Sequence, residues 1–203
     1  MDVNPIKCRS LALEADGWCR QLQCEPSPNF DARPPKTAVD LLVIHNISLP
    51  PGQFGGGFIA DFFGNRLDYE AHPYFDQLRA LRVSAHFLIR RDGVIVQFVS
   101  GNDRAWHAGV SRFHERERCN DFSIGIELEG TDFEAFADAQ YSALVDLTVG
   151  LRQRYPLRNV TGHEHIASGR KTDPGPYFDW QKFEALFGIR ARLALTDLPL
   201  LFP

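Results

Sequence analysis

Short apolar segments between turn signals restrict the fold of this chain more than any other sequence feature. The run 41–44, Leu-Leu-Val-Ile, is typical of a buried strand that ends at His45. The β-rich runs 86–90 and 94–99 flank an Asp-Gly pair, which is a strong short-range signal for a hairpin. The first half of the chain is therefore predicted to supply at least one central strand and one antiparallel pair.

The next segments predict a further strand and a long helix. Residues 122–128 alternate apolar and polar side chains, which predicts a half-buried strand with Glu127 on the polar face. Apolar residues recur at helical spacing across 139–155, and Asp138 is the expected N-cap.

The last elements complete an alternating order. A short strand is expected at 160–163, and a helix is expected over 180–187, with Asp179 as its cap and Gly188 at its end. The order strand, hairpin, strand, helix, strand, helix predicts a single α/β domain with a central mixed β-sheet flanked by helices.

Composition sets the class and the domain boundaries. The 203 residues are 44% apolar, which is enough for a sizeable core, and a net charge of −4 argues against a nucleic-acid partner. No apolar run approaches the roughly 18–20 residues of a membrane helix, and no signal-peptide pattern is visible, so a cytoplasmic protein without a membrane partner is expected. We expect an irregular lead-in at 1–35, the domain at 36–190 and a tail at 191–203.

Two histidines and one aspartate are candidates for a metal site. His45 and His163 end strands, although a single histidine in such a place is more often a hydrogen-bonded core residue. Asp173 lies in the proline-rich stretch 171–176, which is stiff and, if extended, points Lys171 and Asp173 the same way. A turn with a solvated lysine and a capping aspartate fits that stretch equally well.

Together, His45, His163 and Asp173 would form a set of two imidazoles and one carboxylate. Three protein ligands with a fourth position left to water are the pattern of a catalytic zinc site. Glu127 is the candidate for a nearby proton acceptor, but Glu129 points the same way, and either could be an ordinary surface residue. The pair Cys19 and Cys24 lacks further ligands nearby, so free thiols are expected there.

Several stretches, taken in order, match one known group of enzymes. These stretches are residues 45–56, which begin His-Asn-Ile-Ser-Leu-Pro-Pro-Gly; residues 82–86, Arg-Val-Ser-Ala-His; residues 88–93; residues 104–109, Arg-Ala-Trp-His-Ala-Gly; residues 116–130; and residues 171–176, Lys-Thr-Asp-Pro-Gly-Pro. Across about residues 36–185 the chain resembles the cytoplasmic N-acetylmuramoyl-L-alanine amidases specific for 1,6-anhydro muropeptides. These belong to the zinc amidases, together with phage-lysozyme-type amidases and peptidoglycan recognition proteins.

The resemblance assigns roles to the candidate residues. It implies that His45, His163 and Asp173 bind Zn²⁺, that Glu127 is the general base and that Lys171 stabilises the oxyanion. It also implies a peptidoglycan-recognition-like fold with zinc in a groove on one face. His165 departs from the family, in which an acidic residue is expected after Thr-Gly-His.

The resemblance further implies hydrolysis of the amide between 1,6-anhydro-N-acetylmuramic acid and L-alanine, in cytoplasmic peptidoglycan recycling. The partner would be a small soluble anhydro-muropeptide, and a monomer is expected. Asn46 and Trp106 are candidates for substrate contacts, with Trp106 as a wall for the sugar, and Arg82 and Arg118 are candidates for the stem-peptide carboxylates. A core tryptophan and solvated arginines are the plainer interpretations.

Two other functions compete with this one. A peptidoglycan-binding module without catalysis would keep the groove but lack part of the zinc set. A zinc endopeptidase would use the same donor chemistry on a peptide bond, and sequence chemistry alone does not separate the two hydrolases.

Overall fold

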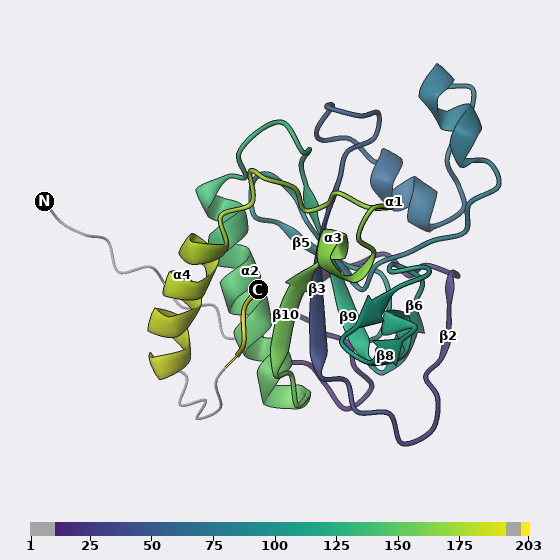
Figure 1. Cartoon of the computed structure of the whole chain (residues 1–203). Helices are drawn as coiled ribbons and strands as arrows, with labels where there is room; N and C mark the ends of the chain where they lie inside the picture. The colour runs from purple at the N-terminus through teal and green to yellow at the C-terminus, as the bar shows by residue number, and fades with distance from the viewer. Residues whose placement is uncertain (1–10, 194–199) are drawn as a thin grey trace, which may run out of the picture.

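A six-stranded mixed β-sheet forms the centre of the protein (Figure 1). The computed structural model describes residues 11–193 and 200–203. The sheet order is β1 (Gln23–Cys24), β5 (Ile95–Gln97), β4 (Phe87–Ile89), β9 (Ser123–Glu129), β3 (Leu41–Ile47) and β10 (Asn159–Gly162). The β4–β5 pair is antiparallel and the other neighbours are parallel, so the predicted mixed sheet is confirmed.

Helices and short strands surround this sheet. The helices are α1 (Phe58–Phe63), α2 (Asp138–Arg154), α3 (His163–Ile166) and α4 (Trp180–Leu193), with 3₁₀ turns η1 (Pro73–Leu78) and η2 (Cys119–Asp121). The short strands β2 (Phe30–Ala32) and β6 (Asp103–Ala105) pair with each other, as do β7 (Arg112–Phe113) and β8 (Arg116–Glu117). None of the described helices combines the length and the apolar character that crossing a membrane requires.

Alternation along the central strands divides the core into layers. Leu42 and Ile44 of β3 pack in one cluster with α2 and α4, which lie side by side on one face of the sheet (Figure 1). Leu41 and Val43 point into a different cluster on the other face. A third cluster joins α1 and η1 to β4 and β5.

Most predicted elements form, and two differ for reasons of packing. All seven residues of β9 are buried, so the prediction of a half-buried strand is wrong: β9 lies between β3 and β4, with layers on both faces. Helix α4 continues past Gly188 to Leu193, because Phe183, Phe187 and Ala191 extend one apolar stripe into the core. Helix α2 begins at Asp138, with Ala137 rather than Asp138 as its N-cap.

The described part of the lead-in segment is mostly turns and irregular structure, but it contributes two short strands to the fold. Strand β1 extends the main sheet and β2 pairs with β6. Leu11 is 1% exposed and packs against α2 near Gly150. At the other end, Leu201 bridges to Asn159 of β10. The domain boundaries at residues 36 and 190 stay a prediction.

A half-buried arginine connects the lead-in to the rest of the protein by hydrogen bonds. Arg33 Nη1 donates to the carbonyl oxygens of Asn120 and Asp121, both at 3.0 Å. Its Nη2 donates to those of Ser123, at 2.8 Å, and Gly101, at 3.3 Å. Burial lowers the pKa of Arg33 to about 10, so the guanidinium still carries its charge at neutral pH.

We predict that Arg33→Met lowers the free energy of unfolding by about 2–5 kcal/mol, because it leaves several buried carbonyls without their donor. The control is Arg20→Met in the same segment, because Arg20 is 62% exposed and pairs only with surface carboxylates. Urea denaturation of both variants measures the difference. An equal, small change in the two midpoints would contradict the anchoring role of Arg33.

Candidate metal centre

Parallel strand pairing brings the predicted ligands together near the carboxyl ends of two neighbouring strands. Ile44 of β3 is in register with Gly162 of β10, so the next residues, His45 and His163, lie next to each other. His163 is also the first residue of α3. Asp173 lies in the loop between α3 and α4, and its backbone oxygen accepts a hydrogen bond from Glu164 N at 2.8 Å.

Three donor atoms form a small triangle. His45 Nδ1 and His163 Nδ1 are 3.0 Å apart, and each lies 3.0 Å from Asp173 Oδ2. Among the described residues, His45, His163 and Asp173 form a cluster of side chains that could hold a metal ion, and neither Cys19 nor Cys24 belongs to such a cluster. Tetrahedral bonds of about 2.0–2.1 Å to Zn²⁺ would place the donor atoms roughly 3.3 Å apart, so the triangle fits such an ion.

The protonation of these groups suits a cation. Burial lowers the pKa of His45 to about 4, so its imidazole is neutral at pH 7. Burial by itself would raise the pKa of Asp173, but the His163 and His45 rings hold it below its ordinary range, so it is a carboxylate. His163 Nε2 faces the carbonyl oxygen of Ala108 at 3.2 Å, and because a carbonyl oxygen only accepts, this contact favours the tautomer that presents Nδ1 as the ligand atom. A metal ligand needs this state of each group.

A carboxylate without a hydrogen-bond partner lies beside the triangle. Glu127 of β9 is in direct register with His45 of β3. It is 9% exposed, and its Oε2 atom is buried with no partner among the described residues. Burial raises the pKa of Glu127 well above its ordinary value, the charge of Asp173 adds to the rise, and that of Lys171 opposes it. Groups left unpaired at such a cost are a common sign of function.

Glu129, the alternative proton acceptor, already has two structural partners. Its Oε1 accepts from Gly55 N at 2.6 Å, and its Oε2 accepts from Arg91 N at 3.1 Å. It therefore ties two loops to the end of β9. This geometry favours Glu127 over Glu129 as the group that exchanges protons.

The triangle and Glu127 open into one cleft of about 850 Å³. Among the predicted site residues, the cleft is lined by His45, Asn46, Trp106, Glu127, His163, Lys171 and Asp173. Trp106 is half-buried and Lys171 is exposed. The structure thus brings the predicted metal ligands, both predicted catalytic residues and two of the four predicted substrate contacts to one place.

The other two predicted contacts lie outside the cleft lining. Arg82 is exposed, and its Nη1 donates to the carbonyl oxygens of Arg79 and Leu81. Arg118 is exposed and pairs with Asp121. Their contact with substrate stays a prediction.

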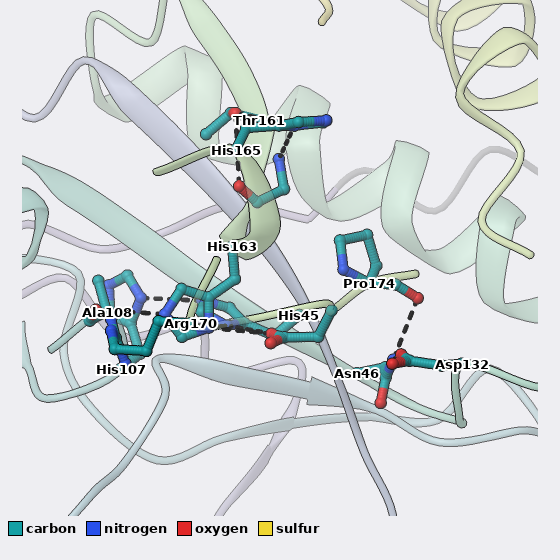
Figure 2. A network of polar contacts seen from close by, with 12 residues as sticks. His45, Asn46, His107, Ala108, Asp132, Thr161, His163, His165, Arg170 and Pro174 are labelled. Carbon is teal, nitrogen blue, oxygen red and sulfur yellow. Dashed lines mark hydrogen bonds and ion pairs between the residues drawn. The ribbon is translucent and has the colours of Figure 1, made fainter. Parts of the chain in front are cut away.

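Asn46 connects two walls of the cleft. Its Nδ2 donates to Asp132 Oδ1 at 2.6 Å and to the carbonyl oxygen of Pro174 at 3.0 Å (Figure 2). Asn46 thereby holds the loop after β9 against the segment that carries Asp173. It has this structural role whether or not it contacts substrate.

Sequence reasoning missed several residues of the cleft, among them Phe133 and Arg170. Phe133 is 84% exposed and lines the cleft from the loop after β9. Arg170 also lines the cleft, and its Nη2 donates to the carbonyl oxygens of Ala108 and Val110. An isolated phenylalanine in a polar loop was the available signal for the first, whereas the second depends on contacts that the sequence does not reveal.

The chain is similar in sequence to known amidases. The family model described as N-acetylmuramoyl-L-alanine amidase matches residues 35–176. The 1,6-anhydro-N-acetylmuramyl-L-alanine amidase AmpD of Citrobacter freundii is 58% identical over 173 residues, which cover 84% of this chain and 92% of that protein.

Solved structures show the same fold. The crystal structure of a Se-Met AmpD derivative has a TM-score of 0.82 at 58% identity, with 84% of this chain and 97% of that chain covered. The Drosophila peptidoglycan recognition protein PGRP-SA has a TM-score of 0.53 at 19% identity and covers 76% of this chain and 85% of its own. The predicted peptidoglycan-recognition-like fold is confirmed.

We predict opposite effects on stability for the two neighbouring glutamates. Glu129→Gln should lower the free energy of unfolding by about 1–3 kcal/mol, because an amide has only one acceptor oxygen and leaves one of the two backbone N–H groups without its acceptor. Glu127→Gln should not lower it, because this change removes a buried carboxylate that lacks a partner. Urea denaturation of the metal-free protein at pH 7 compares them. Equal losses would contradict the assignment of a structural role to Glu129 alone.

Proposed function

The chain belongs to the N-acetylmuramoyl-L-alanine amidase family, and we propose that it hydrolyses the amide between 1,6-anhydro-N-acetylmuramic acid and L-alanine with the help of zinc. One observation carries this proposal: a triangle of two imidazoles and a carboxylate shares a cleft with an unpartnered buried carboxylate oxygen. The complete donor set argues against a module that only binds peptidoglycan.

Zinc is the metal that the donor set favours. His45, His163 and Asp173 would hold it, and three such ligands are typical of catalytic rather than structural zinc. When bound, Zn²⁺ supplies a Lewis acid that polarises the amide carbonyl and lowers the pKa of water to about 7.

Two residues of the chain would handle the proton and the charge. The Glu127 carboxylate accepts a proton from the attacking water and delivers it to the nitrogen of L-alanine as the carbon–nitrogen bond breaks. The products are the lactyl carboxylate of the sugar and the free amine of the peptide. The Lys171 ammonium stabilises the negative oxygen of the tetrahedral state. Its charge also acts on Glu127, where it opposes the rise of the pKa.

The cleft also suggests how the substrate lies. The Trp106 ring is a flat apolar wall for a sugar face, and Phe133 offers a second aromatic surface on the loop after β9. Arg170 and Lys171 give this cleft positive charge, and Arg170 is a candidate to bind a carboxylate of the muropeptide. Arg82 and Arg118 do not line this cleft, and we assign them to the carboxylates of the stem peptide.

The cellular setting follows from the same substrate. We place the protein in the cytoplasm as a monomer that acts on small soluble anhydro-muropeptides during peptidoglycan recycling. The name of the Citrobacter freundii relative supports this choice of substrate.

We predict that the purified protein binds one Zn²⁺ per chain and that His163→Ala loses it, because two remaining ligands hold zinc weakly. Elemental analysis after gel filtration measures the content. His114→Asn is the matched control, because His114 is exposed and lies outside the triangle. One tightly bound zinc in His163→Ala would remove His163 from the ligand set.

The role of Glu127 predicts a loss of turnover without a loss of metal. Glu127→Gln should lower kcat by about 10²–10⁴-fold, which is the usual contribution of a general base, and should keep its zinc. Glu134→Gln, which changes another carboxylate of the same cleft, should turn over nearly normally. If Glu127→Gln also turned over nearly normally, another group would have to be the base.

The substrate assignment predicts a preference for the anhydro sugar. A site shaped to the bicyclic ring must bury an unpaired hydroxyl of the reducing sugar, at a cost of about 1–3 kcal/mol, so kcat/KM should be roughly tenfold to a hundredfold higher on anhydro-muropeptides. Mass spectrometry of both digests should show the intact peptide and the free sugar. Equal efficiency on both substrates would argue for a wall-lytic amidase, and cleavage inside the peptide would indicate an endopeptidase.

A further inference from the structure

Two consecutive residues after β6 contact the two histidines of the metal centre. His107 Nδ1 lies 3.0 Å from His45 Nε2, and the carbonyl oxygen of Ala108 lies 3.2 Å from His163 Nε2 (Figure 2). Each contact is made to the ring nitrogen that is not part of the donor triangle. Residues 107 and 108 therefore contact both imidazoles at Nε2. The Nδ1 atoms of the two rings remain available to bind a metal.

These contacts determine which nitrogen of each ring carries the proton. A carbonyl oxygen only accepts, so Ala108 keeps the proton of His163 on Nε2 and leaves Nδ1 with its lone pair. For His45 to present Nδ1 as a ligand, its Nε2–H must donate to His107 Nδ1. His107 then carries its own proton on Nε2, which lies 3.1 Å from the hydroxyl oxygen of Ser123.

One side-chain oxygen accepts from both backbone N–H groups of this segment. Asn120 Oδ1 accepts hydrogen bonds from His107 N at 3.2 Å and from Ala108 N at 2.8 Å. Asn120 lies in η2, which directly precedes β9. This one amide oxygen therefore ties both backbone N–H groups of the segment to the residues that precede β9.

The His107 ring packs directly against the backbone of the sheet. It is buried, and its ring meets that of His45 edge to face, with centroids 5.1 Å apart. It packs on Gly125 of β9 so closely that a Cβ at that position would lie 2.4 Å from the ring. Glycine at 125 is thus needed for the close approach of the imidazole.

We propose that His107 and Asn120 are positioning residues that hold both metal-binding histidines in the tautomer and orientation that a metal needs. His107 acts on His45 through its Nδ1 acceptor. Asn120 acts on both histidines, because it holds the backbone that carries His107 and the Ala108 carbonyl. The proposal rests on the metal centre of the proposed function and is independent of the substrate.

Zinc affinity, measured by competition with a chromophoric chelator, tests the proposal without any assay of activity. His107→Gln keeps a polar group near Ser123 but removes the acceptor next to His45, and its Zn²⁺ dissociation constant should rise about 10–100-fold. His107→Asn places an amide oxygen near the position of Nδ1 and should recover most of the affinity. A merely structural role would give no such difference between the two amides.

Asn120 offers the second matched pair. Asn120→Ala removes the acceptor for both backbone N–H groups and should weaken zinc binding by a similar factor, whereas Asn120→Asp keeps the oxygen and should bind nearly as the unchanged protein does. Because Asn120 is only half-buried, this pair keeps the test decisive if a His107 variant fails to fold. Circular dichroism of each metal-free variant establishes that it is folded.

The outcomes separate this proposal from the metal centre itself. Normal zinc affinity in folded Asn120→Ala and His107→Gln, with loss of zinc in His163→Ala, would overturn the positioning role and leave the metal centre intact. Equal losses in Asn120→Ala and Asn120→Asp would also overturn it. Tight zinc binding in His163→Ala would instead contradict the metal centre on which it rests.

Discussion

The parallel pairing of β3 with β9 on one side and β10 on the other is the constraint on which the site depends. The register places Glu127 opposite His45, and it places His163 one residue beyond the Ile44–Gly162 pair. A slip of one residue would turn these side chains to the opposite face, among the apolar residues that pack under α2. The apolar clusters on the two faces of the sheet therefore fix the strand register. They determine the arrangement of the candidate site residues at the carboxyl ends of the strands as well as the stability of the sheet.

Two buried glutamates near the carboxyl end of β9 show how the fold holds a carboxylate whose burial costs free energy. Glu129 is satisfied by two backbone donors, whereas Glu127, two residues earlier on the same strand, keeps one oxygen unpaired. Burial and the nearby Asp173 carboxylate both disfavour its charge, and only Lys171 favours it. The central position of β9 between two paired strands holds Glu127 in place in spite of that cost.

Turn residues and hydrophobic periodicity correctly predicted the elements whose formation depends on nearby residues in the sequence. The hairpin of β4 and β5, the strand β3 and the helix α2 follow from turn residues and periodicity, and His45 and His163 follow from their places at strand ends. The full burial of β9 and the length of α4 depend on neighbours distant in sequence, so periodicity alone misjudged them. His107 lies within a recognised motif, but its contact with His45, 62 residues away, depends on the folded register.

A line of hydrogen bonds connects Arg33 in the lead-in to the candidate metal centre. Arg33 Nη1 donates to the backbone oxygen of Asn120, and the side chain of the same Asn120 accepts from the segment that contacts His45 and His163. Arg33 stands two residues before the region matched by the amidase family model. Its buried charge has four carbonyl acceptors in fixed places, so a shift of the lead-in would move η2 and, with it, the orientation of both imidazoles. The lead-in is therefore part of the framework that shapes the site, although it contributes no ligand to it.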